Sequence, residues 1–255
     1  MPTDFDELVQ DLKDKDWKTR STAASLLGRS GNPHAVKPLI QVTLHDPYFA
    51  GGREGYPIRK VALESLRRMI DPLCKSGTGW AEGLLVSILE AAVSPECQYD
   101  WNGRLCVASA RALVRQFSCS RISLQSPVIV ISEDDPDINA LTGLILKVAG
   151  LGVASTLDGT EALELASLIH PDLVLLDVYM PGITGIEVCR RLKENPATSA
   201  IPVAFLSAKG QEAEIKRGLE SGAVEYIVKP FAPDDLVLQV KDILRRCELA
   251  IYEED

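Results

Sequence analysis

Five short apolar runs alternate with amphipathic segments in the second half of the chain, and this alternation restricts the fold more than any other sequence feature. The runs are VIVI at 128–131, GVAS at 152–155, LVLL at 173–176, VAFL at 203–206 and EYIV at 225–228. The amphipathic segments lie near 136–149, 159–168, 184–193, 211–221 and 233–248. Nearly continuous apolar strands are typical of a parallel sheet covered on both faces. The pattern therefore predicts a doubly wound (βα)5 domain with right-handed crossovers.

The first half has no alternating strand pattern, and its apolar residues recur at helical spacing up to about residue 120. Asp16 is a suitable N-cap for a helix that Gly31 ends. A second helix is expected to start near Pro33, which gives an antiparallel helical hairpin. This half is predicted to be all-α.

A sequence pattern in this half returns after 39 residues: RSTAASLL from Arg20 is echoed by RKVALESL from Arg59, and a looser echo begins at Arg104. Helical pairs of this length resemble HEAT-type repeats, in particular the short repeats of phycobilisome lyases. The residues that carry the resemblance are Asp16, Arg20, Ala23, Ala24, Leu27 and Gly28. The resemblance implies a solenoid with a broad surface for a protein partner, and plain amphipathic helix packing is the alternative.

Between Phe117 and Ser126 the helical spacing of apolar residues gives way to short apolar runs that alternate with amphipathic segments, which predicts a domain boundary. We expect a helical-repeat domain at 1–120, a linker at 121–126, an α/β domain at 127–249 and an acidic tail at 250–255. The segment FAGGREGYP lies between the first two repeats and is expected to form a surface loop.

Charge and composition narrow the classes of function. Residues 1–125 carry 16 Lys and Arg against 14 Asp and Glu, and residues 126–255 carry 11 against 22. This near-neutral first half predicts no nucleic-acid partner. The scattered cysteines and histidines predict neither a disulfide framework nor a zinc site. No apolar run is long enough to span a bilayer and no secretory signal is visible, so we expect a cytoplasmic protein without membrane insertion.

Carboxylates follow two of the predicted strands. Glu133 and Asp134 come after the first strand, and Asp177 ends the third in the run LVLLD. Reactive groups collect at the carboxyl ends of strands in such a fold, where three acids would repel one another without a cation. The sequence therefore predicts a Mg²⁺ site, for which Mn²⁺ is an alternative.

Ser207 and Lys229 occupy the ends of the last two strands. A lysine beside carboxylates can pair with one of them at rest and later with a phosphoryl oxygen, to which a serine hydroxyl can also donate. The five residues together predict a site for phosphoryl transfer.

These residues lie in motifs that make the segment from Val128 to Leu249 resemble a response-regulator receiver domain, which has a flavodoxin-like fold. The motifs are VISEDDPDIN, PDLVLLDVYMPGITG, IPVAFLSA and GAVEYIVKPF. The resemblance implies that Asp177 is the phosphoacceptor and that Ser207 and Tyr226 form a switch. It also implies a metal ligand from the backbone carbonyl of Tyr179 and a cis peptide bond before Pro230.

The expected function is that of a two-component response regulator. A histidine kinase or phosphotransfer protein is expected to supply the phosphoryl group to Asp177. The protein is not expected to be an enzyme, apart from its own phosphorylation and dephosphorylation at Asp177. The helical domain binds an output protein, and a homodimer through the face at 211–247 is possible. The alternatives are a DNA-binding transcriptional regulator, which would need a basic recognition helix, and a lyase-type enzyme in the helical half.

Overall fold

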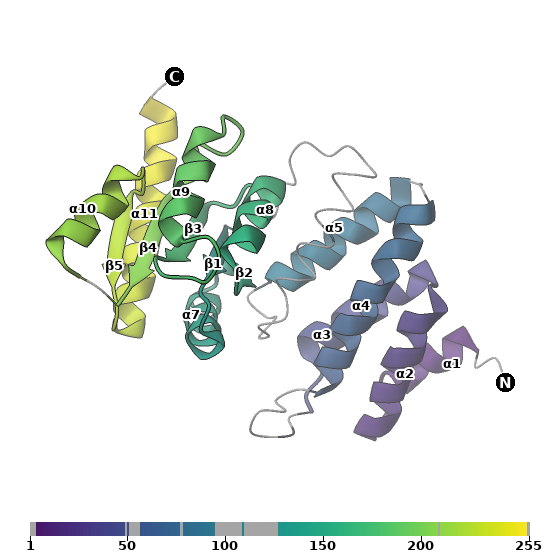
Figure 1. Cartoon of the computed structure of the whole chain (residues 1–255). Helices are drawn as coiled ribbons and strands as arrows, with labels where there is room; N and C mark the ends of the chain where they lie inside the picture. Colours follow the sequence, from purple (N-terminus) through teal and green to yellow (C-terminus); the bar gives the residue numbers. More distant parts are fainter. Residues whose placement is uncertain are drawn as a thin grey trace. The chain divides into compact units, whose positions relative to one another are not determined.

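The computed structural model describes residues 4–48, 50, 57–76, 79–94, 109, 127–208 and 210–253. The chain divides into two compact units, Met1–Ser120 and Arg121–Asp255, which are treated separately below (Figure 1). The predicted linker at 121–126, the looser repeat from Arg104 and most of the predicted loop at 49–57 lie outside the described residues.

The first unit is helical wherever it is described in regular structure. Asp16 caps the second helix by accepting hydrogen bonds from the backbone N–H groups of Lys18 and Thr19, and Gly31 ends that helix with a left-handed φ of 64°. A short helix precedes Asp16 that the sequence pattern did not predict. The elements are α1 (Phe5–Asp11), α2 (Trp17–Ser30), the 3₁₀ turn η1 (Pro33–Ala35), α3 (Val36–His45), α4 (Pro57–Ser76) and α5 (Gly79–Val93).

The residues that recur after 39 positions form the core of this unit. Helix α4 packs against α2, α3 and α5, and Ala23, Leu27, Ala62 and Leu66 are all buried. Gly28 of α2 meets α4 so closely that a β-carbon there would lie 2.3 Å from Cβ of Ser65. Small residues thus allow the helices to approach, while the leucines fill the seam between them.

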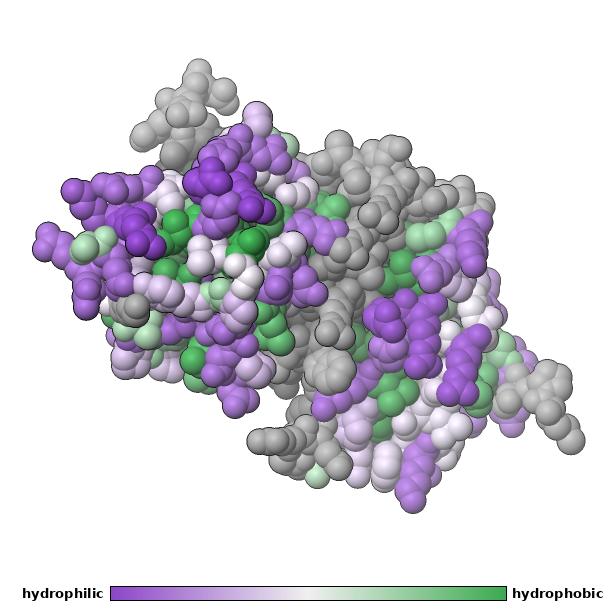
Figure 2. Space-filling model, viewed as in Figure 1, coloured by the Kyte–Doolittle hydropathy of each residue, from purple (hydrophilic) through white to green (hydrophobic). Residues whose placement is uncertain are grey.

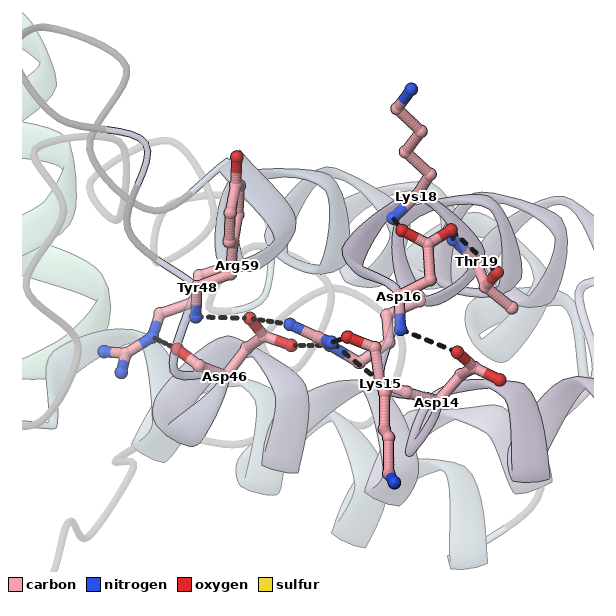
Figure 3. Close-up of polar contacts among 9 residues, drawn as sticks. Asp14, Lys15, Asp16, Lys18, Thr19, Asp46, Tyr48 and Arg59 are labelled. Atoms are coloured by element: carbon pink, nitrogen blue, oxygen red, sulfur yellow. Dashed lines mark hydrogen bonds and ion pairs between the residues drawn. The ribbon is translucent and has the colours of Figure 1, made fainter.

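A buried ion pair between Arg20 and Asp46 joins the first turn of α2 to the end of α3 (Figure 3). Arg20 donates from Nε to Oδ2 of Asp46 at 2.7 Å and from Nη2 to Oδ1 at 3.2 Å. Its Nη1 donates to the backbone carbonyls of Asp14 and Lys15, before α2. Arg59, which follows Arg20 by the 39-residue repeat, donates from Nε to the backbone carbonyl of Asp46 at 2.7 Å. The two repeat-related arginines therefore converge on one residue.

The second unit contains a five-stranded parallel sheet with the order β2-β1-β3-β4-β5. This is the strand order of the flavodoxin-like fold, whose topological switch point lies between β1 and β3. The strands are β1 (Val128–Ser132), β2 (Gly152–Thr156), β3 (Leu173–Asp177), β4 (Val203–Ser207) and β5 (Glu225–Val228). The predicted strands and their order along the chain are confirmed.

Helices cover both faces of this sheet (Figure 1). One face packs on α7 and α11 through a core that includes Ile129, Leu175, Leu146 and Val240. On the other face α8 packs against β1, β2 and α9, and α10 packs against β5. The helices are α7 (Pro136–Val148), α8 (Gly159–Ile169), α9 (Gly185–Glu194), α10 (Glu212–Glu220) and α11 (Pro233–Glu253).

The last helix is longer than predicted. Helix α11 continues to Glu253, so residues 250–253 of the predicted acidic tail belong to its final turn. Apolar residues such as Leu249 and Ile251 continue the helical pattern past the expected end. Within the described part of the chain, no helix is long and apolar enough to cross a membrane.

Candidate functional site

Polar residues gather at the carboxyl edge of the sheet because four neighbouring strands end there. Glu133 and Asp134 follow β1, Asp177 ends β3, Ser207 ends β4 and Lys229 follows β5. Since β1, β3, β4 and β5 are successive neighbours, the parallel strands deliver these residues side by side. The expected convergence of the strand ends is therefore present in the fold.

Three carboxylates form the centre of the site. Oxygen atoms of Glu133, Asp134 and Asp177 all lie within 4.8 Å of one another. Glu133 and Asp177 are buried, and Asp134 is exposed. Carboxylate oxygens are hard ligands of the kind that Mg²⁺ binds. This donor set fits a small divalent cation.

Lys229 lies among these acids. Its Nζ is 2.9 Å from Oδ1 of Asp177 and also donates a hydrogen bond to Oε2 of Glu133. Burial raises the pKa of Glu133, and the nearby charges of Asp177 and Asp134 raise it further, although Lys229 opposes this shift. Burial alone would lower the pKa of Lys229, but its hydrogen bonds to Glu133 and Asp177 outweigh burial and raise it. The ammonium form of Lys229 is thus stabilised.

The carboxylate of Asp177 is fixed by one contact on each oxygen. Oδ1 accepts from Lys229, and Oδ2 accepts from the backbone N–H of Tyr179 at 2.7 Å. The Tyr179 ring is exposed, and its hydroxyl donates to Glu214 on α10. This contact links the loop after β3 to the fourth helix of the α/β unit.

Gly185 supports the same loop and was not identified from the sequence. A β-carbon on Gly185 would lie 2.1 Å from the backbone oxygen of Asp177, so only glycine fits where α9 begins. Its N–H donates to the carbonyl of Val178 at 3.1 Å. The second glycine of PGITG was a possible signal, but a close approach of backbone to backbone cannot be read from a pattern of residues.

Ser207 and Tyr226 lie on adjacent strands. Ser207 is fully buried, and its backbone oxygen accepts from the N–H of Lys229 at 2.8 Å. Tyr226 is only 8% exposed, and its ring packs at 5.9 Å from that of Phe205 and against Gly218 of α10. The Tyr226 ring is thus buried between β5 and α10. The Lys229–Pro230 peptide bond is cis, the isomer that the resemblance implies.

Comparison with known proteins assigns the α/β unit. Residues 129–241 match the model of the response regulator receiver domain. The phosphate regulon transcriptional regulatory protein PhoB of Rhizobium meliloti is 41% identical over 122 residues, which cover 48% of this chain and 54% of that protein. The DNA-binding response regulator MtrA of Mycolicibacterium smegmatis is 42% identical over 120 residues, covering 47% of this chain and 51% of MtrA.

A solved structure of a putative response regulator from Chloroflexus aurantiacus is 36% identical, with a TM-score of 0.46, and its alignment covers 48% of this chain and 99% of that one. Residues 129–241 are a response regulator receiver domain. The chain spans about half the length of the curated relatives it matches.

These relatives contradict the prediction that the chain has no nucleic-acid partner, because MtrA is described as DNA-binding and PhoB as a transcriptional regulator. The prediction depended on a charge averaged over residues 1–125, which conceals local differences. Residues 1–16 carry two Lys and Arg against six Asp and Glu, whereas residues 17–76 carry ten against four. An average over a domain therefore does not exclude a basic surface within it.

Proposed function

We propose that the chain is a two-component response regulator in which Asp177 accepts a phosphoryl group from a phosphohistidine of a histidine kinase or phosphotransfer protein. The observation that supports this most directly is the contact of Lys229 with Asp177 inside a group of three carboxylates. The receiver domain assignment of residues 129–241 supports it independently.

The residues of the site have complementary roles in this reaction. An Asp177 oxygen forms a bond to phosphorus while the phosphorus–nitrogen bond of the phosphohistidine breaks, and the ring nitrogen that keeps the electron pair takes a proton from solvent to give neutral imidazole. Lys229 and Ser207 donate to the phosphoryl oxygens as charge shifts onto them. Water later hydrolyses the aspartyl phosphate and restores the free carboxylate.

A divalent cation completes the proposed site. Glu133, Asp134, Asp177 and the backbone carbonyl of Tyr179 would hold Mg²⁺, or Mn²⁺ in its place. The cation would supply neutralisation of the clustered acids and of the phosphoryl oxygens. We propose no enzymatic activity for the chain beyond gain and loss of its own phosphoryl group.

Phosphorylation would act as a switch through Ser207 and Tyr226. The phosphoryl group adds negative charge and strong acceptor oxygens beside Ser207. A shift of Ser207 at the end of β4 would disturb the neighbouring β5, where the Tyr226 ring packs over Gly218. The output signal would then leave through α10, β5 and α11.

Replacement of Lys229 by alanine tests this coupling. We expect Lys229→Ala to retain Mg²⁺ binding, because all three carboxylates remain, but to lose the response of α10 and β5 to beryllofluoride, a phosphoryl mimic. Amide chemical shifts in the full chain measure both properties. Lys216→Ala on the exposed face of α10 is the matched control and should respond as the wild type does. A full wild-type response of Lys229→Ala would contradict the proposed role.

For the helical unit we propose a HEAT-like output domain that binds another protein. The recurrence of buried Ala23 and Leu27 at Ala62 and Leu66 supports this reading. Stacked helical pairs present broad surfaces that suit protein partners.

A nucleic-acid partner is the second candidate, favoured by the relatives and by the charge of residues 17–76. Figure 2 shows hydrophilic side chains over α2 and α4, and the exposed cations there include Lys18, Arg29, Arg68 and Lys75. If about three of these contact phosphates, affinity for duplex DNA should fall at least about tenfold when the salt concentration rises from about 50 to about 200 mM.

A fluorescence anisotropy titration at several salt concentrations tests this candidate. The double variant Arg68→Glu with Lys75→Glu should weaken DNA binding and flatten its salt dependence, while Lys216→Glu in the receiver unit should leave both unchanged. Absence of binding at the lower salt concentration, or binding that salt does not affect, would exclude it and favour the protein partner.

A further inference from the structure

Asn139 lies in the first turn of α7, three helical positions after Pro136, and is 1% exposed. A polar side chain at such a depth costs free energy unless hydrogen bonds compensate it. Its Nδ2 donates to two backbone oxygens, that of Glu133 at 3.1 Å and that of Thr156 at 2.6 Å. The side chain thus joins the ends of β1 and β2 to the start of α7.

These bonds complete the support of the segment that carries two of the acids. The N–H of Glu133 donates to the oxygen of Thr156 at 3.2 Å, so both backbone polar groups of Glu133 are engaged. Asp135 caps α7 through the N–H groups of Asp137 and Ile138. The carbonyl that Asn139 holds belongs to the peptide bond between Glu133 and Asp134, and its orientation therefore influences both carboxylates.

The need for such support follows from electrostatics. Three carboxylates with oxygens within 4.8 Å of one another repel, and the exposed Asp134 is free to swing toward solvent if its peptide plane can rotate. Within the described part of the chain, Oδ1 of Asn139 is a buried atom without a hydrogen-bond partner. Burial of Oδ1 without a hydrogen-bond donor costs free energy. The two hydrogen bonds that Nδ2 donates therefore explain why asparagine is present at this position.

We propose that Asn139 is a positioning residue of the phosphorylation site: its amide holds the Glu133–Asp134 peptide so that both carboxylates face the cation. This inference rests on the proposed function. Asn139 would supply no ligand to the cation; it acts through its hydrogen bond to the backbone oxygen of Glu133.

The test is a Mg²⁺ titration of the full chain, followed by amide chemical shifts, with the metal alone as the probe. Asn139→Leu keeps a similar shape and removes both donors together with the unsatisfied acceptor. Asn139→Ala removes the same groups without crowding, in case leucine packs poorly. We expect the Kd for Mg²⁺ to rise about 10- to 100-fold in both variants, as is typical when a hydrogen bond that orients a metal ligand is lost.

A second readout separates positioning from a general loss of stability. In labelling with acetyl phosphate, the Mg²⁺ concentration for half-maximal rate should rise by a similar factor, while the rate at saturating Mg²⁺ should change far less. Leu146→Ala, a buried core substitution on the same helix, is the control that destabilises the unit without touching the acid segment. It should bind Mg²⁺ as the wild type does.

The outcomes are distinguishable. Binding of Mg²⁺ by both Asn139 variants within about twofold of the wild type would overturn the inference alone, as would an equal loss in Leu146→Ala. A wild-type chain with no saturable response to Mg²⁺ would overturn the proposed function and the inference with it.

Discussion

Asp177→Asn should reduce phosphoryl labelling of the chain to background. The amide has nearly the shape of the carboxylate but lacks the anionic oxygen that attacks phosphorus. Because Glu133 and Asp134 remain, some Mg²⁺ affinity should persist, and Lys229 keeps its contact with Glu133. The variant is therefore expected to fold and yet not to be phosphorylated.

Intact-mass spectrometry after incubation with acetyl phosphate, with and without Mg²⁺, measures the effect. The wild type should gain one phosphoryl group only when Mg²⁺ is present. Asp234→Asn, which makes the same chemical change at an exposed position in the first turn of α11, should be labelled normally. Labelling of Asp177→Asn at the wild-type yield would assign the acceptor to another residue.

Asp46→Ala should lower the free energy of unfolding of the helical unit by about 3–5 kcal/mol, the usual cost of leaving one partner of a buried ion pair alone. Arg20 and Asp46 expose only 10% and 3% of their side chains. The substitution would also remove the acceptor of the Tyr48 N–H, which lies 3.0 Å from Oδ1 of Asp46. The charge of Arg20 would then remain buried with only carbonyl partners.

Urea denaturation followed by tryptophan fluorescence measures this loss in the full chain, because all three tryptophans lie in residues 1–120. The control is Glu64→Ala, which removes an exposed ion pair with Arg67 and Arg68 on α4. That variant should lose no more than about 1 kcal/mol. Equal losses in the two variants would show that the buried pair has no special importance for this unit.

Local patterns determined much of the α/β unit. Apolar runs of four residues, bounded by turns, predict the starts of the five strands and their ends within one residue. The amphipathic segments expected at 136–149 and 184–193 correspond to α7 and α9, which Asp135 and Thr184 cap. Since parallel strands bring those ends to one edge, the sequence also predicted which acids meet.

Local sequence patterns predicted less of the structure of the helical unit. The 39-residue recurrence identified buried Leu27 and Leu66, and Asp16 and Gly31 bounded a helix. Helix α1 and the meeting of Arg20 and Arg59 at Asp46 did not follow from it, and the averaged charge led to a wrong conclusion about partners. Helical periodicity predicts which residues are buried, but it does not predict which buried polar groups form hydrogen bonds or ion pairs with one another.

Tertiary structure decided the contacts between residues that are distant in sequence. Asn139 reaches the oxygen of Thr156 across 17 residues, Arg20 reaches Asp46 across 26, and Gly185 leaves room for the backbone of Asp177. Each contact depends on how strands and helices pack side by side. Residue types and their spacing along the chain do not specify this packing. The sequence by itself determined the strands, the caps and the acids at the sheet edge, because these depend on neighbours along the chain; the support around those acids was decided only by the fold.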